Sequence, residues 1–376
     1  MKAASRRRLL AALRRERLLL VFGAVALLLG LVDPAPPLRW LQWLSLPTLL
    51  GLLALLVCIE GIRASGAVQR AAQALARHAH SQRALALMLV GGAALLAMVL
   101  TNDVSLFLLV PLTLALGRGS ELPARRVVIL EALGVNAGST LSPVGNPQNL
   151  LLWQHSGLSM PQFAWRMLPS AATMLALLLL TVWLLVPARP LHVAAGAAPA
   201  GVPRLRRRLA AASALALLGV LALLQAQRPA LAALLVLAMY LAAWREVLRR
   251  VDWGLLATLA AMFVGLGHLG HWAPLQAMLG RLDWHAPGVV YVGGVALSQL
   301  LSNVPATVLL WPQVGRATAL AVAVNVGGFG LALGSLANLI ALRLEGRGNL
   351  REFHRISLPF LLVCAPLVWL VQRFVA

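Results

Sequence analysis

The side chain most suggestive of chemistry is Asp103, which follows Thr101 and Asn102 within the apolar stretch 84–117. An acidic residue at mid-membrane depth is costly and is by default a candidate for function. Away from bulk water, this carboxylate would either bind a cation or take up a proton. A structural carboxylate that is satisfied by hydrogen bonds is the alternative. Asp103 is therefore a candidate site for a sodium ion or a proton.

A second apolar stretch, 287–315, is interrupted in the same way by Ser302 and Asn303. In both stretches the arms beside the polar residues are only about 12 to 18 residues long, which is short for a membrane crossing. Such segments are typical of re-entrant hairpins, whose tips must be buried in protein or face a water-filled cavity. We therefore expect two hairpins, over 84–117 and 287–315.

Two further segments, 125–153 and 317–344, are long enough to span a membrane but hold clusters of Gly, Pro and Asn in their middle. Such residues break a helix and expose N–H groups at one half and C=O groups at the other. Glycines that only allow close helix packing are the alternative. The residues predicted to bind substrate and ion are Thr101, Asn102, Asp103, Asn136, Gly145, Asn146, Asn149, Ser302, Asn303, Asn325, Gly334, Ser335 and Asn338.

The two broken segments also resemble each other. NAGSTLSPVGNPQNL, from Asn136 to Leu150, aligns without gaps to NVGGFGLALGSLANL, from Asn325 to Leu339. Each follows a hairpin, which predicts a first repeat over 18–186 and a second over 209–376. Between equivalent first spans the chain would cross the membrane five times, an odd number, so the repeats would be inverted. Inverted repeats with paired broken elements are typical of secondary transporters, which bind substrate and ions near the midplane.

The composition of the chain excludes a soluble enzyme and a disordered protein. Its 376 residues are 60% hydrophobic and 11% charged, whereas roughly 25% are charged in an average soluble domain. The sequence therefore predicts an all-α polytopic membrane protein with two inverted repeats, two re-entrant hairpins and two broken helices. About nine spans are expected, at 18–32, 46–60, 125–153, 166–186, 209–225, 229–244, 251–268, 317–344 and 356–375.

The net charge of +21 would suggest nucleic acid in a soluble protein, but here the basic residues lie in short loops. Of the 32 basic residues, 26 fall in loops that the predicted topology places on one side, and 6 fall on the other. The excess marks the cytoplasmic side. We thus expect a cytoplasmic basic N-terminus at 1–17, a cytoplasmic linker at 187–208, an outside C-terminus and no nucleic-acid partner.

Glu131, early in the span 125–153, is a further candidate for a proton site. No catalytic residue, resident metal or cofactor is expected; the coupling ion would be sodium or a proton. The sequence also has no phosphate-binding loop for a nucleotide. Transport would therefore be driven by an ion gradient or by the substrate's own gradient.

These motifs resemble those of the citrate-transporter-like permeases of the ion transporter superfamily, which include divalent anion/sodium symporters and arsenite permeases. The resemblance covers roughly 45–375 and is carried by the two tips, by the S-P-V-G-N-P-Q-N run that starts at Ser142 and by the G-S-L-A-N run that starts at Gly334. It implies an elevator-type carrier and a homodimer. The dicarboxylate symporters have Ser-Asn-Thr at both tips, whereas this chain has Asp103 and Val304 at the third positions. The Asn-Asp pair is more similar to the arsenite-permease branch.

The sequence therefore predicts an ion-coupled secondary active transporter of a small anion in a bacterial cytoplasmic (inner) membrane. A sodium/proton antiporter or an arsenite efflux permease is the alternative, favoured by Asp103. A channel or an intramembrane enzyme is the alternative outside this class, although no nucleophile–base or metal motif supports an enzyme. The expected partners are the small anionic substrate, the lipid bilayer and a second copy of the chain.

Overall fold

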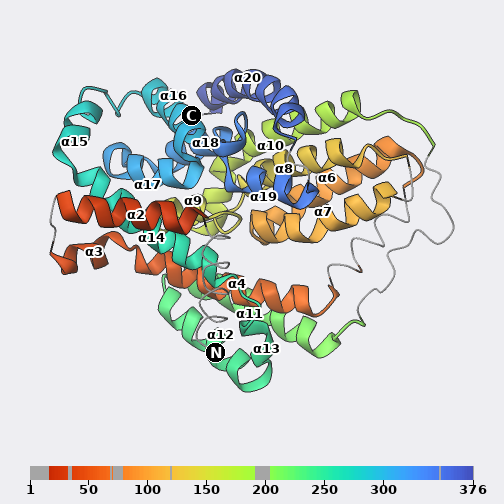
Figure 1. Ribbon diagram of the computed structural model, residues 1–376, viewed down its shortest axis with the longest axis horizontal. Helices are drawn as coiled ribbons and strands as arrows, with labels where there is room; N and C mark the ends of the chain where they lie inside the picture. Colours follow the sequence, from red (N-terminus) through yellow and green to blue (C-terminus); the bar gives the residue numbers. More distant parts are fainter. Residues whose placement is uncertain are drawn as a thin grey trace, which may run out of the picture.

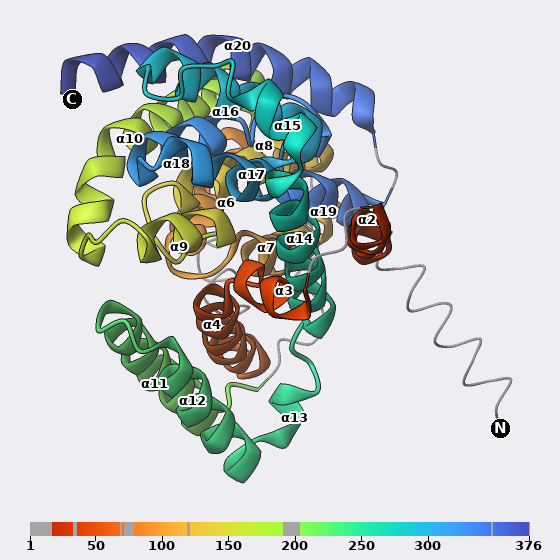
Figure 2. The ribbon, with the colours of Figure 1, turned by 90° about the vertical axis from the view of Figure 1, so that its left-hand side faces the viewer.

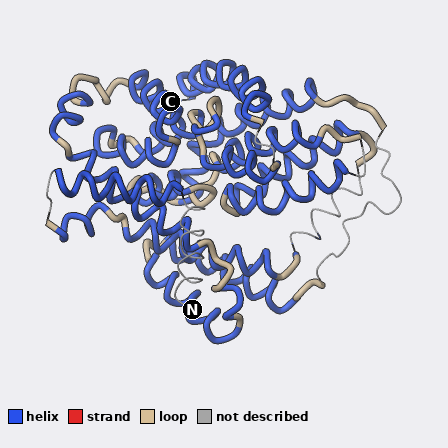
Figure 3. The backbone as a smooth tube through the Cα atoms, in the orientation of Figure 1, coloured by secondary structure: helices blue, strands red, loops and turns tan. Residues whose placement is uncertain are grey.

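The computed structural model describes residues 17–32, 36–67, 70, 79–118, 121–190, 204–346 and 349–375. Apart from one isolated bridge between Ser81 and Pro190, these residues form helices and loops without strands (Figure 3). The predicted all-α class is confirmed for this part of the chain. Nearly all of the predicted N-terminal segment 1–17 and most of the predicted linker 187–208 lie outside the described residues.

The helices form two groups, which we call the core bundle and the wall helices. In the core bundle, α8 packs against α6, α7, α10 and α19, while α18 packs against α16, α17 and α9 (Figure 1). The bundle consists of α6 (Gln82–Val99), α7 (Asn102–Arg118), α8 (Ala124–Ser139), α9 (Pro147–Gln154), α10 (Met160–Leu185), α16 (Pro287–Leu301), α17 (Asn303–Val314), α18 (Ala317–Val326), the 3-10 helix η1 (Ala332–Gly334), α19 (Leu336–Glu345) and α20 (Leu350–Val375).

The wall helices lie along one side of this bundle. Figure 2 shows α4 between the bundle and the paired helices α11 and α12, and it shows α2 beside α14. The wall consists of α2 (Arg17–Val32), α3 (Pro37–Trp43), α4 (Leu46–Ala64), α11 (Arg207–Gln225), α12 (Pro229–Ala243), α13 (Arg245–Leu248), α14 (Trp253–His271) and α15 (Ala273–Leu279).

In the described part of the chain, five helices are long and apolar enough to cross a membrane, namely α4, α6, α10, α11 and α20. The bent pair of helices α14 and α15 gives a sixth such segment if the two form one span. The predicted spans 125–153 and 317–344 are each divided into two short helices, and α2 and α12 have only 16 and 15 residues. The chain is thus a multi-pass membrane protein, whereas nine spans stay a prediction.

The two predicted hairpins correspond to two pairs of packed helices. α6 ends at Val99 and α7 begins at Asn102, and α16 ends at Leu301 and α17 begins at Asn303. Between the second pair, Ser302 has a φ of 78°, which is uncommon for a residue other than glycine and turns the chain sharply. α6 is long enough to cross a membrane by itself, so the re-entrant course of 84–117 stays a prediction.

Both long segments that carry the glycine, proline and asparagine clusters are interrupted. The first break covers 140–146, between α8 and α9, and the second covers 327–335, between α18 and α19. The second halves begin at equivalent positions of the aligned segments. Asn146 caps α9 by accepting from the backbone N–H of Asn149 at 2.8 Å, and Ser335 caps α19 by accepting from that of Ala337 at 3.3 Å.

One glycine allows the centre of the bundle to form. Residues 127–139 of α8 are all buried, and a Cβ atom at Gly138 would lie 2.0 Å from the carbonyl oxygen of Ala94 on α6. Only glycine therefore allows the backbones of these two helices to come this close. By contrast, α10 exposes Leu180, Trp183 and Leu184, as expected for a helix that faces lipid.

Candidate functional site

Both hairpin tips line one cavity of about 350 Å³, which we call the tip cavity. Asn102 and Asp103 reach it from the first tip and Asn303 from the second, while Gln148 and Ser335 reach it from α9 and from the start of α19. The facing side is formed by α2, α4 and α14 and is mostly apolar. The cavity therefore lies between the core bundle and the wall helices. Its facing residues include Phe22, Val25, Leu52, Leu56, Leu255, Thr258, Leu259 and Met262.

Behind the cavity, the two broken helices exchange side-chain hydrogen bonds reciprocally. The amide of Asn136 donates to Oδ1 of Asn338 at 3.0 Å, and the amide of Asn325 donates to Oδ1 of Asn149 at 2.7 Å. In the aligned segments, Asn136 is equivalent to Asn325, and Asn149 is equivalent to Asn338. All four residues are at most 2% exposed, so each bond is made where water cannot replace it.

The side-chain oxygens of Asn136 and Asn325 also accept matching hydrogen bonds. Oδ1 of Asn136 accepts from the hydroxyl of Ser335 at 2.9 Å, and Oδ1 of Asn325 accepts from the amide of Asn146 at 3.1 Å. Ser335 and Asn146 are again equivalent residues. The sequence repeat at 136–150 and 325–339 therefore corresponds to a repeated hydrogen-bond arrangement, in which each half supplies partners for the other half.

The hairpin tips are less fully bonded than the amides behind them. Asn102 donates to Oδ1 of Asn136 at 3.4 Å, while the side chain of Asn303 makes no hydrogen bond within the described residues. Three buried oxygens beside the cavity also have no partner there, namely Oγ1 of Thr101, Oδ1 of Asn102 and Oε1 of Gln148. Buried polar atoms are rarely left unpaired, so these atoms are suited to contact a ligand or a bound ion.

Asp103 connects the tip cavity to a second one of about 360 Å³, which we call the polar vestibule. The vestibule is lined by Glu60, Arg63, Arg250 and Asp252 at the ends of wall helices. Glu60 accepts two hydrogen bonds from Arg63, at 2.6 and 2.7 Å. Asp103 itself makes no side-chain hydrogen bond or ion pair within the described part of the chain, so its carboxylate is available to an ion.

Glu131 lies apart from this site. It is fully buried in α8, and one of its oxygens accepts a hydrogen bond of 2.5 Å from the hydroxyl of Thr113 on α7. The other oxygen, Oε2, has no partner among the described residues. Glu131 does not line the tip cavity, so the structure does not bring this predicted proton site together with the tips.

Several predicted site residues hold the break in place and do not line the tip cavity. The amide of Asn149 donates to the carbonyl oxygens of Ser139, Thr140 and Ser142, at 3.0 to 3.1 Å, and thereby holds the first break in shape. A Cβ atom at Gly145 would lie 2.5 Å from the carbonyl oxygen of Ala97, which makes this glycine a packing residue. At Gly334, the corresponding distance to the carbonyl oxygen of Gly327 is 2.7 Å.

Gln148 is a site residue that the sequence prediction missed. It lines the tip cavity, and its amide donates to Oδ1 of Asn325 at 3.3 Å. The sequence signal that could have identified it was its position beside Asn149 in the aligned segments. In the structure the equivalent residue of the second segment, Ala337, lines the cavity as well. No group of three or more His, Cys, Asp or Glu residues that could hold a metal occurs in the described ranges.

Together, the two paired breaks, the two polar tips and a cavity enclosed by apolar helices define a membrane transporter. Comparison with known proteins agrees: residues 9–317 match the citrate transporter family, and the chain belongs to this family. It is 37% identical over 354 residues to the inner membrane protein YbiR of Escherichia coli K12, and the match covers 94% of each chain.

Two relatives with shorter matches are transporters by name. An uncharacterized transporter of Methanocaldococcus jannaschii, MJ0456, is 30% identical over 262 residues, which are 68% of this chain and 69% of the relative. The silicon efflux transporter LSI3 of Oryza sativa subsp. japonica is 35% identical over 77 residues, 20% of this chain and 16% of the relative.

Proposed function

We propose that this protein is an ion-coupled secondary active transporter of a small anion. The observation that carries the proposal is the tip cavity, in which the amide of Asn303 and the oxygens at the first tip face an enclosed space with no partner from the described chain. An amide donates to the oxygens of an anion and offers its own oxygen to a cation. A substrate anion and a coupling cation can therefore share the cavity, each partly neutralising the other.

The coupling ion binds at the first tip. Asp103 supplies a negative charge, and Thr101 and Asn102 supply neutral oxygens that have no other partner among the described residues. Oxygen ligands of this kind suit a hard cation such as sodium. A proton on Asp103 is the second form of coupling, because protonation also removes an uncompensated charge from a mostly apolar cavity. The polar vestibule gives either ion a route to Asp103.

Transport occurs by an elevator movement of the core bundle against the wall helices. The tip residues all belong to the bundle, while the apolar side of the cavity belongs to the wall, so sliding one group past the other would carry the site across the membrane. The reciprocal bonds of Asn136 and Asn325 support an inverted pair of repeats. The protein lies in the bacterial inner membrane with its N-terminus inside and its C-terminus outside, in agreement with the distribution of basic residues.

The wall helices also provide a contact surface for a second copy of the chain. Leu215 and Leu218 on α11 and Leu234 and Leu235 on α12 are more than half exposed, and α11 and α12 are farthest from the core bundle (Figure 2). In a homodimer these helices would form a fixed centre, so that each core bundle could move independently.

Efflux is the second candidate function. A carboxylate at the first tip, together with the 77-residue similarity to the silicon efflux transporter, favours export of a small oxyanion or weak acid in exchange for a cation. Arsenite efflux belongs to this candidate, and sodium/proton antiport, which exchanges two cations, is the other alternative that a carboxylate at the first tip favours. In uptake the cation and the substrate would cross the membrane in the same direction. In efflux they would cross it in opposite directions.

Reconstituted protein tests these proposals directly. Flux of citrate, succinate, sulfate, phosphate, arsenite and silicic acid would be measured in proteoliposomes with an imposed sodium or proton gradient of either direction. Saturable, gradient-driven flux of one of these compounds is expected, and its direction separates uptake from efflux. Flux that rises linearly with substrate concentration would indicate a channel and overturn the proposal.

Two tip variants connect this transport to the cavity. Asn102→Ala and Asn303→Ala should each abolish flux with little loss of folded protein, because both side chains face the cavity. Gln372→Ala is the matched control, since it removes an amide that donates to Ser170 outside the cavity. Normal transport by both tip variants would exclude the tip cavity as the binding site.

A further inference from the structure

A separate cavity of about 370 Å³ lies where α8 and α20 begin and where α10 ends. We call it the basic cavity because Arg126, Arg351 and Arg355 line it, and among the described residues Glu352 is its sole acidic lining residue. The lining is completed by Leu185, Asn349 and Ile356. None of these residues lines the tip cavity or the polar vestibule, so the basic cavity is independent of the proposed transport site.

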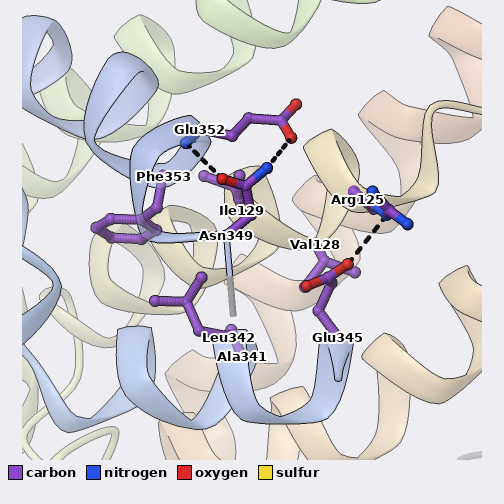
Figure 4. A pocket seen from close by; sticks show the side chains of 9 residues that line it. All are labelled: Arg125, Val128, Ile129, Ala341, Leu342, Glu345, Asn349, Glu352 and Phe353. Atoms are coloured by element: carbon purple, nitrogen blue, oxygen red, sulfur yellow. Dashed lines mark hydrogen bonds and ion pairs between the residues drawn. The ribbon is translucent and has the colours of Figure 1, made fainter. Parts of the chain in front are cut away.

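The ion pairs around the basic cavity leave part of its positive charge unpaired. Arg125 is paired with the largely buried Glu345 at 3.1 Å, and Figure 4 shows this pair beside Asn349 and Glu352. Glu352 is engaged by the amide of Asn349 at 3.3 Å and lies 3.9 Å from Arg126. Within the described residues, Arg351 and Arg355 form no ion pair.

Two features prepare the basic cavity for an anion. The guanidinium of Arg126 donates to the carbonyl oxygen of Leu185 at 3.0 Å, which fixes it at the edge of the cavity. The cavity also lies at the N-terminus of α20, a helix of 26 residues, where the helix dipole favours negative charge. Arginines bind the oxygens of a phosphate group bidentately, whereas a single carboxylate can satisfy only one of three guanidinium groups in this way.

We propose that the basic cavity binds the phosphate group of an anionic phospholipid. The exposed apolar side chains of α10, namely Leu180, Trp183 and Leu184, come directly before Leu185 at the cavity. α10 packs along α20, so acyl chains can lie against these two helices while the headgroup occupies the cavity (Figure 2). Arg126, Arg351 and Arg355 also count among the 26 basic residues that the predicted topology places on the cytoplasmic side. On that side, basic pockets between membrane helices are suited to lipid headgroups.

The test is lipid binding by the purified full-length protein in detergent, measured by native mass spectrometry with phosphatidylglycerol and phosphatidylcholine of identical acyl chains. Retention of phosphatidylglycerol over phosphatidylcholine is expected. Arg351→Gln together with Arg355→Gln should weaken it roughly tenfold or more, as two lost arginine–phosphate contacts imply. The matched control is Arg207→Gln with Arg208→Gln, which removes the same charge at the start of α11, away from the cavity.

Two further variants test the proposal even if Arg351→Gln with Arg355→Gln loses lipid because its structure is disturbed. Arg351→Lys with Arg355→Lys keeps the charge and should retain most of the binding. Glu352→Gln removes the competing carboxylate and should strengthen it. An equal loss in the α11 control, or no effect of Glu352→Gln, would indicate diffuse attraction and overturn the proposal. Competition of inorganic phosphate with phosphatidylglycerol at equal concentration would identify a site for free anions and also overturn it.

Discussion

The two halves of the site are alike behind the cavity and different at its tips. Asn136 and Asn325 make matching hydrogen bonds to the opposite half, with equivalent residues as their partners. At the tips the symmetry ends, because the first carries Asp103 where the second carries Val304. The first side also has Gln148 where the second has Ala337. The repeated amides thus form a frame, and the charged and unpaired groups are added to one side of it.

This difference separates structural roles from functional ones. Residues of the frame have their donors and acceptors satisfied by each other, so their replacement should cost stability. At the first tip, the carboxylate of Asp103 and the oxygens of Thr101 and Asn102 have no such partners in the described chain, so their replacement should cost transport and little else. Variants of the frame should therefore lose folding free energy, and variants of the first tip should lose coupling.

The largest effect is expected at the close contact between α8 and α6. In Gly138→Ala the new Cβ would lie 2.0 Å from a carbonyl oxygen, and backbone cannot move aside without separating the helices. At the equivalent Gly327 the nearest atom is Cβ of Ser298, at 2.5 Å. We expect Gly138→Ala to prevent isolation of folded protein, and Gly327→Ala to cost about 1–3 kcal/mol as an overpacked site.

The measurement is the yield of monodisperse protein and its melting temperature in detergent. Gly219→Ala is the control, because outside its chain neighbours and its own helix backbone no atom of the described residues lies within 4 Å of the added Cβ. Alanine in a helix is favoured over glycine by roughly 1 kcal/mol. Equal damage by Gly138→Ala and Gly327→Ala would mean that the two halves pack alike.

The second prediction concerns the reciprocal amides. Asn136→Ala strands the oxygen of Asn338, and Asn325→Ala strands that of Asn149; each buried unpaired group costs about 1–3 kcal/mol. Both variants should therefore lower thermal stability, and by similar amounts. Adding Asn338→Ala to Asn136→Ala should cost less than the sum of the two single changes, since the stranded partner is removed as well. Strictly additive losses would contradict a direct bond.

The frame could be predicted from the sequence because glycine, proline and asparagine break helices by local chemistry. Asn136 and Asn325 head two segments that align without gaps, which was enough to place both breaks and to relate them. The role of Asn149 was harder to predict. From residue type alone, its side chain could equally well bind an ion. In the structure its amide instead donates to three carbonyl oxygens of its own loop.

The remaining features depend on packing that one apolar sequence does not encode. Leu56 and Leu255 face the tip cavity while neighbouring leucines face other helices. The sequence alone does not distinguish a leucine that faces a cavity from one that faces lipid. The contribution of Gln148 depends on the rotation of α9, which the capping residue Asn146 fixes. The number of spans was difficult for a related reason, because broken helices no longer meet a length criterion.

The third prediction moves to the tips, where transport should change and stability should not. Asp103→Asn keeps the shape of the side chain and removes its charge, and no hydrogen bond within the described residues is lost. The variant should no longer concentrate substrate, although it should still exchange substrate downhill. Flux against an imposed sodium or proton gradient measures this.

An exchange of the two third positions sharpens the result. Asp103→Val combined with Val304→Asp places the carboxylate at the second tip and removes it from the first, which carries the unpaired oxygens of Thr101 and Asn102. It should fail to restore coupling. Restored coupling would mean that the charge alone is needed, on either tip.

The smallest effect is expected at Glu131, the carboxylate buried in α8. In Glu131→Gln the remaining amide oxygen can still accept from Thr113, and the new NH₂ group replaces an oxygen that has no partner in the described structure. An uncompensated buried charge would be destabilising, and the amide is neutral and has the same size. We therefore expect no loss of stability beyond about 0.5 kcal/mol and an unchanged ion dependence of flux. Thr113→Val is the control for the hydrogen bond, since it removes the donor and should cost more than Glu131→Gln, about 1 kcal/mol or more. If instead Glu131→Gln abolishes coupling while Asp103→Asn retains it, the driving ion binds inside the core bundle on α8, and the asymmetry of the tips serves the substrate.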